Sequence, residues 1–95
     1  MIIVNIKGKV TKIFPIEQKT DKFSIRKFIV EVSEKEKSNK YLIQTTNSRC
    51  SFLEMVKTGD TVSVDSELIS KEYTSQKTGE NVIFISLNAF KIDCI

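Results

Sequence analysis

The strongest constraint on the fold is an alternation of apolar and polar side chains that recurs along most of the chain. It is clearest in the stretch VKTGDTVSVDSELISKEY, residues 56–73, where Gly59 and Asp60 form a turn signal and the alternation begins directly after them. A period of two residues is typical of a β-strand with one buried face. The pattern therefore predicts an all-β protein, with a turn at this glycine that re-aims the chain into a long strand.

Four other segments carry the same strand-like pattern. They are residues 2–14, which end at Pro15, and residues 23–32, 41–47 and 82–92. Gly8 lies within the first of them and marks a bulge or a sharp bend, because the apolar positions shift after it. The polar segments between the strands, residues 16–22, 33–40 and 74–81, are expected to be loops.

One segment interrupts the alternation. In SRCSFLEMVKTG, residues 48–59, apolar residues cluster as in a short helix, with Ser48 or Ser51 as the N-cap and Gly59 as the C-terminal stop. Five strands with one short helix between the third and the fourth is the order of an OB-fold, a small Greek-key barrel. The main alternative is an SH3-like barrel, which usually lacks a helix at this place.

Length and composition agree with one small globular unit. The 95 residues can bury roughly two-thirds of the surface of the unfolded chain, so we expect a single OB-fold domain over residues 1–95. No apolar run approaches the roughly 20 residues that span a bilayer, and no signal peptide is evident, so we expect a cytoplasmic protein without a membrane partner. Cys50 and Cys94 lack metal or redox spacing and are expected to remain reduced thiols.

The positive charge is concentrated in the first part of the chain. Residues 1–40 contain ten Lys/Arg and five Asp/Glu, a net charge of +5, whereas the remainder contains five and seven, a net charge of −2. A basic half in a small domain favours a polyanionic partner. The alternative is that these lysines only keep the surface soluble and protect edge strands.

The sequence argues against catalysis. It contains no histidine, the residue most used for acid–base chemistry near neutral pH and for metal binding. It also has no glycine-rich phosphate loop, no nucleophile elbow and no paired carboxylates at a defined spacing. We therefore expect no enzyme activity, no catalytic residues, no metal and no cofactor.

The residues also resemble a known family. The segments GKVTKIFP, RKFIVEV, VKTGDTVSVDSELISKEY and LNAFKI, spread over residues 6–92, resemble a family of short bacterial OB-fold proteins of unknown function that is similar to single-stranded DNA-binding proteins. The resemblance implies a barrel whose exposed face binds single-stranded nucleic acid. In this sequence Thr46 stands where we expect an aromatic residue at the end of the third strand.

Binding of single-stranded nucleic acid requires cations along the phosphates and flat rings on which bases stack. The candidate residues for this role are Lys7, Lys9, Lys12, Phe23, Arg26, Lys27, Tyr73, Lys77 and Phe84. Arg26 is the leading cation, because a guanidinium can both stack on a base and hold a phosphate. The other aromatic residues are read differently: Phe14, Phe28 and Phe52 as core, Tyr41 as half-buried, and Phe90 as core or part of a self-association patch.

Two functions follow, and the sequence leaves both open. The first is a non-catalytic protein that binds single-stranded DNA with little sequence preference in replication, repair or recombination, with RNA as a variant. The second is a protein-interaction or assembly module on the same barrel without nucleic acid, favoured by the modest net charge, the absence of tryptophan and Thr46. Because Ile29, Ile69 and Ile83 are on the exposed side of their strands, we also expect a homo-oligomer.

Overall fold

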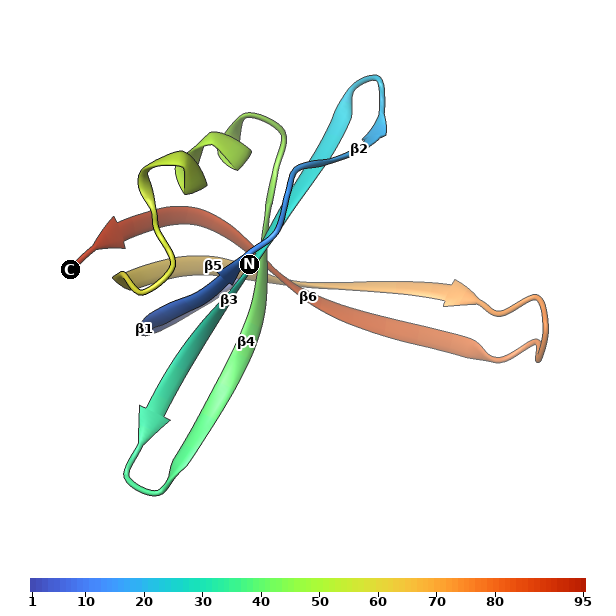
Figure 1. Ribbon diagram of the computed structural model, residues 1–95. Helices are drawn as coiled ribbons and strands as arrows, with labels where there is room; N and C mark the ends of the chain where they lie inside the picture. Colours follow the sequence, from blue (N-terminus) through green and yellow to red (C-terminus); the bar gives the residue numbers. More distant parts are fainter.

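The computed structural model describes residues 1–95, most of which lie in strands. The elements are β1 (Ile2–Ile13), β2 (Glu17–Thr20), β3 (Phe23–Glu34), β4 (Lys37–Thr46), the 3-10 helix η1 (Asn47–Met55), β5 (Thr61–Thr74) and β6 (Asn81–Cys94). Five strands close a barrel, and the short β2 only adds to β3 outside it. The helix follows β4 and lies beside one end of the barrel (Figure 1). The predicted five-stranded OB-fold with one helix between its third and fourth barrel strands is confirmed.

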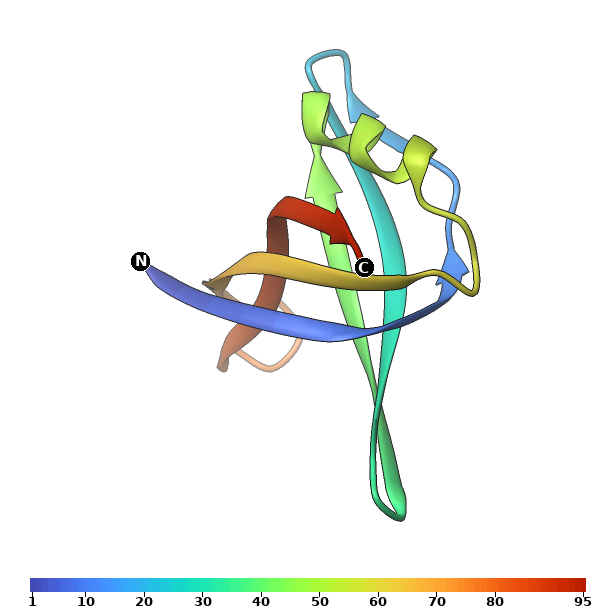
Figure 2. The same cartoon turned by 90° about the vertical axis from the view of Figure 1, so that its left-hand side faces the viewer.

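Strand β1 closes the barrel because it pairs with two different neighbours. Residues 2–9 pair antiparallel with β5, and residues 9–13 pair antiparallel with β3. The remaining order is β5, β6, β4 and β3, in which only the contact between β4 and β6 is parallel. Figure 2 shows β1 and β5 running across the β3–β4 pair at a steep angle. The two layers thereby enclose one interior.

Gly8 lies where β1 passes from one neighbour to the other. A Cβ atom at this position would collide with the carbonyl oxygen of Glu31 and come within 2.9 Å of the Val30 side chain. The glycine therefore permits the close approach of β1 and β3 that closes the barrel. The irregularity expected at Gly8 lies instead between Val10 and Lys12, where the register of β1 against β3 shifts.

The core draws on every barrel strand and on the helix. Its buried members are Ile6, Val10, Phe28, Val30, Ile43, Leu53, Val56, Val62, Val64 and Ala89. The strand members occupy alternate positions, so the period of two in the sequence correctly marks the inward side. Phe28 is buried as predicted, whereas Phe52 of the helix is 37% exposed. The prediction of a core position for Phe52 is therefore wrong, because the single helix turns only Leu53 and Cys50 inward.

The predicted helix is shorter than expected and differently capped. It ends at Met55, and its N-cap residue is Thr46, which forms no side-chain hydrogen bond with the helix. Neither predicted serine cap is used. Gly59, at φ 101°, belongs to the following turn, in which the backbone N–H of Lys57 donates to Asp60 Oδ2 over 2.9 Å. The Gly-Asp turn is thus a barrel corner, as the sequence predicts. The helix η1, with nine residues, is too short to span a bilayer.

Three hairpins project from the barrel in different directions (Figure 1). The segment 33–40, expected to be a loop, is mostly strand with a two-residue turn at Lys35 and Glu36, and the segment 16–22 contains β2. Both loop predictions were wrong because a two-stranded ribbon exposes both of its faces to water. Its backbone groups can pair without any apolar alternation in the sequence. The loop expected at 74–81 is confirmed as residues 75–80.

Candidate functional site

A row of polar side chains crosses the outer side of the barrel from β3 to β6. Lys27 of β3 is paired with Gln44 of β4, and Gln44 is paired with Asn88 of β6. Their chain neighbours Thr45 and Ala89 are buried, so the three residues of the row point away from the core. The side chains of Gln44 and Asn88 are joined directly, since Gln44 Nε2 donates to Asn88 Oδ1 over 2.6 Å.

The same side continues without a break onto the hairpin of β5 and β6. Between residues 81 and 89 strand β6 pairs with β5 in regular register, so Phe84 lies on the same side as Asn88. Lys71 is paired with Phe84, and Tyr73 follows two positions along β5. We call these residues together the outer face: Lys27, Gln44, Lys71, Tyr73, Phe84 and Asn88.

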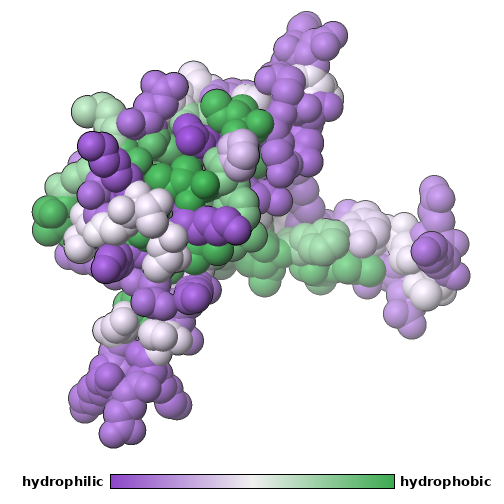
Figure 3. Space-filling model, viewed as in Figure 1, coloured by the Kyte–Doolittle hydropathy of each residue, from purple (hydrophilic) through white to green (hydrophobic).

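The two predicted rings of the hairpin meet on the outer face. The ring centroids of Tyr73 and Phe84 are 5.2 Å apart and the ring planes differ by 17°, so the rings are stacked. Tyr73 is 46% exposed and Phe84 56% exposed, so both can contact a ligand. Figure 3 shows hydrophobic surface along this hairpin between its polar tip and the barrel. An exposed stack of this kind offers a flat apolar platform next to a lysine.

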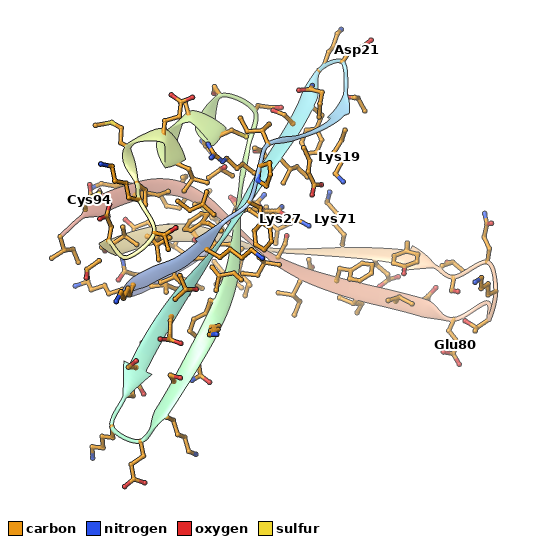
Figure 4. The ribbon with its side chains drawn as sticks, in the orientation of Figure 1. Lys19, Asp21, Lys27, Lys71, Glu80 and Cys94 are labelled. Atoms are coloured by element: carbon orange, nitrogen blue, oxygen red, sulfur yellow. The ribbon has the colours of Figure 1, made fainter.

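Lysines from three strands project on the side of the molecule between two of the hairpins. Figure 4 shows the side chains of Lys19, Lys27 and Lys71 in the angle between the β2–β3 hairpin and the β5–β6 hairpin. They come from β2, β3 and β5. Strand β2 is paired with β3, whereas β4 and β6 lie between β3 and β5. Lys19 and Lys27, on the neighbouring strands β2 and β3, form a local positive patch that the modest net charge of +3 does not reveal.

One carboxylate lies among these lysines. Glu17 Oε2 is 2.7 Å from Lys19 Nζ, and both side chains are about half exposed. The hydrogen bond and the charge of Lys19, with a further contribution from the charge of Lys27, lower the pKa of Glu17 below its ordinary value. Glu17 therefore stays ionised at neutral pH and neutralises part of the positive charge beside the outer face.

Lys12 and Phe14 extend the same side toward β1. Lys12 is paired with Ile29 beyond the register shift of β1, and its Nζ lies 4.8 Å from the centroid of the Phe14 ring. The backbone N–H of Phe14 donates to the carbonyl of Lys27, which places this ring next to the lysine row. Phe14 is half-buried against Lys12, so its predicted place in the core is wrong.

Other predicted cations lie elsewhere. Lys7 is paired with Ser63, and Lys9 is paired with both Thr61 and Glu31, so these two lysines follow the first part of β1 on a different wall of the barrel. Lys77 lies in the exposed turn at the tip of the β5–β6 hairpin. The structure therefore places Lys12, Lys27, Tyr73 and Phe84 on one side of the barrel and its hairpin, and it places Lys7, Lys9 and Lys77 elsewhere.

Arg26 and Phe23 occupy the β2–β3 side of the barrel. Arg26 Nε donates to the carbonyl of Phe14 over 3.0 Å and is half-buried, so this guanidinium fastens the segment after β1 to β3. Arg26 also has the opposite parity to Lys27 in β3 and so points away from the outer face. Phe23 is half-buried at the start of β3, paired with Thr20 close to the tip of the hairpin.

Sequence reasoning missed the amide pair Gln44–Asn88, as well as the roles of Phe14 and Lys19. Alternation with the buried Ile43 and Thr45 could have indicated that Gln44 points outward. No local signal indicates that it meets Asn88, because the two residues are separated by 44 positions and by the parallel contact between β4 and β6.

A second feature lies at the open end of the barrel. A groove of about 600 Å³ runs between the start of β1 and the two long hairpins, and its lining includes Val4, Val32, Tyr41, Leu68 and Leu87. The β5–β6 hairpin turns Ile83 and Ile85 to this side, opposite the rings, where they are 62% and 69% exposed. No group of three or more His, Cys, Asp or Glu side chains is arranged to hold a metal ion.

The barrel is similar to solved structures of single-stranded DNA-binding proteins. A crystal structure of Rim1, the mitochondrial single-stranded DNA-binding protein of S. cerevisiae, matches with a TM-score of 0.74 and 19% identity over 98% of this chain and 93% of that chain. A second crystal form of Rim1 matches with a TM-score of 0.73 and 21% identity over 98% and 94% of the two chains. At these identities the similarity concerns the fold.

The sequence comparisons place the chain in a family. No curated protein matches it. The model of the family described as Domain of unknown function (DUF3127) matches residues 5–93, which is nearly the whole chain. The chain therefore belongs to the DUF3127 family, whose fold here is the OB barrel of single-stranded DNA-binding proteins such as Rim1.

Proposed function

We propose that this protein is a non-catalytic single-stranded DNA-binding protein with little sequence preference. The observation that carries the proposal is the continuity of the outer face, which joins Lys27 on the barrel to Lys71 and the Tyr73–Phe84 stack on the hairpin. Lysines that follow the phosphates and exposed rings that stack on bases are the two elements of sequence-tolerant binding. The similarity of the barrel to Rim1 supports the proposal.

In this proposal the single-stranded DNA crosses β3, β4 and β6 on the outer face of the barrel and continues along the outer face of the β5–β6 hairpin. Its phosphates follow Lys19 and Lys27 on the barrel and then Lys71 on the hairpin (Figure 4). Its bases face the barrel wall and stack on the exposed rings, each stack contributing roughly 1–3 kcal/mol. RNA presents the same phosphates and the same ring faces, so binding of RNA is the variant of this function.

The test is a titration of a fluorescent oligo-dT at several salt concentrations. We expect the logarithm of the binding constant to fall with the logarithm of the salt concentration, with a slope of about −0.7 for each phosphate contacted. Parallel titrations with an oligo-U and a duplex of equal length compare RNA and double-stranded DNA. Absence of binding to any of these probes at low salt would exclude the proposal.

We also propose that the protein acts as a homo-oligomer. Between Ile2 and Gly8, strand β1 pairs with β5 on one edge only, so its other edge presents unpaired backbone groups. The only lysine in this segment is Lys7, and the exposed Ile2 and Ile3 add apolar surface. An open and largely apolar edge of this kind favours pairing with another copy of the chain.

The assembly-module function remains the second candidate, and the apolar groove favours it. The groove at the open end and the exposed Ile83 and Ile85 form a surface that nucleic acid binding does not use. Light scattering separates the two candidates. A defined oligomer whose mass does not change when oligonucleotide is added, together with no oligonucleotide binding, would support assembly alone.

The cellular setting that we propose is DNA replication, repair or recombination in the cytoplasm, where single strands are exposed. Cys50 and Cys94 are both free in the structure, and this agrees with a reducing compartment. Localisation of a fluorescent fusion before and after DNA damage tests this setting. A fusion excluded from the cytoplasm would contradict it.

A further inference from the structure

The Gln44–Asn88 pair has hydrogen-bonding groups that the protein leaves unused. Two side-chain amides can form a cyclic pair with two hydrogen bonds, but here only the bond from Gln44 Nε2 to Asn88 Oδ1 is formed. The carbonyl oxygen of Gln44 and the amino group of Asn88 have no protein partner. Both side chains are half-buried, so each also keeps part of its surface open to solvent.

The bond within the pair joins β4 to β6 and holds each amide in one orientation. Gln44 and Asn88 are the one register pair of the parallel contact between these strands. Because the amide hydrogen of Gln44 is directed at Asn88, the orientation of both amides is defined. The pair therefore keeps the carbonyl oxygen of Gln44 as a free acceptor and the amino group of Asn88 as a free donor.

The position of the pair determines which part of a ligand it can meet. It lies in the row that begins at Lys27, and it is followed along β6 by Phe84 of the stacked rings. A strand whose phosphates follow the lysines and whose bases stack on the rings brings base edges over the centre of this row. A neutral donor and acceptor suit a base edge better than a phosphate, which offers only acceptors.

We propose that Gln44 and Asn88 bind the Watson–Crick edge of one base and thereby select single-stranded over double-stranded nucleic acid. This inference rests on the proposed function. Each of the four bases carries one donor and one acceptor side by side on that edge: the exocyclic amine and ring nitrogen of adenine and cytosine, or the ring N–H and carbonyl of guanine and thymine. In a duplex these groups are already paired. The contact therefore distinguishes pairing state rather than sequence.

The test uses an oligo-dT of about 20 nucleotides, longer than the roughly 4–16 nucleotides that an OB fold covers, and the same oligonucleotide with N3-methylthymine at every position. The methylated probe keeps the phosphates and rings but blocks the Watson–Crick edge. We expect the wild-type protein to bind it roughly 2- to 10-fold more weakly, the range for one or two lost hydrogen bonds.

Three variants locate the effect. In the double variant Gln44→Leu/Asn88→Leu an apolar pair replaces both amides, and we expect it to bind the two probes equally. Asn88→Asp keeps the acceptor for Gln44 Nε2 and thus the bond between β4 and β6, but removes the free donor, so the ratio between the probes should fall below that of the wild type. Asn81→Leu, on the same strand but at the far end of the hairpin, should keep the wild-type ratio. Melting curves show whether each variant is folded.

The outcomes separate the two proposals. Equal binding of both probes by the wild type overturns the edge contact and leaves the proposed function standing. An unchanged ratio in a folded Gln44→Leu/Asn88→Leu variant, or in Asn88→Asp if the double variant does not fold, also overturns it. No binding of either probe by the wild type overturns the proposed function and this inference with it.

Discussion

The two faces of the β5–β6 hairpin carry different chemistry on the same two strands. One face holds Lys71 and the stacked rings of Tyr73 and Phe84 and continues into the polar row of the barrel. The other, the isoleucine face, holds Ile83 and Ile85 and continues into the apolar groove at the open end. The consecutive residues 83–85 therefore serve two surfaces. A run that reads as one apolar patch in the sequence is divided by the pleat of the strand into a ring platform and an apolar face next to the groove.

Removal of the two rings is expected to cause the largest loss of DNA affinity. The double variant Tyr73→Ala/Phe84→Ala should weaken oligo-dT binding by roughly 2–6 kcal/mol, at least about 30-fold, because two stacking positions are lost. The oligomeric mass should not change, since the rings point away from the isoleucine face. Fluorescence titration and light scattering on the same samples measure both quantities.

The matched control for the rings is Tyr41→Ala. Tyr41 is also partly exposed, at 37%, but it lines the groove rather than the outer face. Its removal should leave oligo-dT binding unchanged. An equal loss of affinity in Tyr41→Ala and in the double ring variant would show that binding is not confined to one face.

The isoleucine face gives the next largest effect. We propose that this face adds to the contact between copies at the open edge of β1, so the double variant Ile83→Ser/Ile85→Ser should weaken self-association by roughly 1–3 kcal/mol for each side chain buried there. Light scattering through a dilution series should therefore show dissociation at higher protein concentration than in the wild type. Affinity for oligo-dT per protomer should change little. Loss of DNA binding at unchanged mass would reverse the assignment of the two faces.

Lysine substitutions test whether bound DNA follows the outer face from the hairpin onto the barrel. Lys27→Gln and Lys71→Gln should each reduce the salt slope of oligo-dT binding by about 0.7, the value for one phosphate contact. Lys7→Gln and Lys9→Gln, on the wall formed by β1 and the first part of β5, should leave the slope unchanged. A uniform reduction by all four substitutions would indicate a diffuse positive field without a defined track.

The sequence predicts the barrel well because its core positions depend on local alternation. Val62 and Val64, Phe28 and Val30, and the place of the helix all follow from the order of residues along one strand or turn. The projecting hairpins are predicted poorly for the same reason. At residues 33–40 both faces of the two strands are exposed to solvent. The strands therefore pair without an alternation of apolar and polar residues that would predict them.

The candidate site is predicted only where it follows the same alternation. Tyr73 and Phe84 are predicted because they flank the turn segment 74–81, and the structure adds that they share one face. Lys7 and Lys27 look equivalent in the sequence, and only barrel closure assigns them to different walls. Phe14 turns outward because the register shift after Val10 reverses the parity of β1, and such a shift leaves no composition signal.

The smallest expected effect concerns Glu17, the carboxylate beside the lysines of the outer face. Glu17→Gln frees Lys19 for a phosphate, and we expect about a twofold gain in oligo-dT affinity at low salt, in the range of an exposed ion pair. The folded-state pKa of Glu17 is lowered from 4.5, so at neutral pH the wild-type carboxylate is ionised and the full difference is present. As the pH falls through the lowered pKa, the carboxylate of the wild type is protonated and the two proteins should converge. Titrations at neutral and acidic pH measure this difference.

Glu80→Gln, at the far tip of the β5–β6 hairpin (Figure 4), is the control for the loss of one negative charge. An equal gain from this control would show that Glu17 acts only through net charge and that the lysines beside it form no local phosphate path.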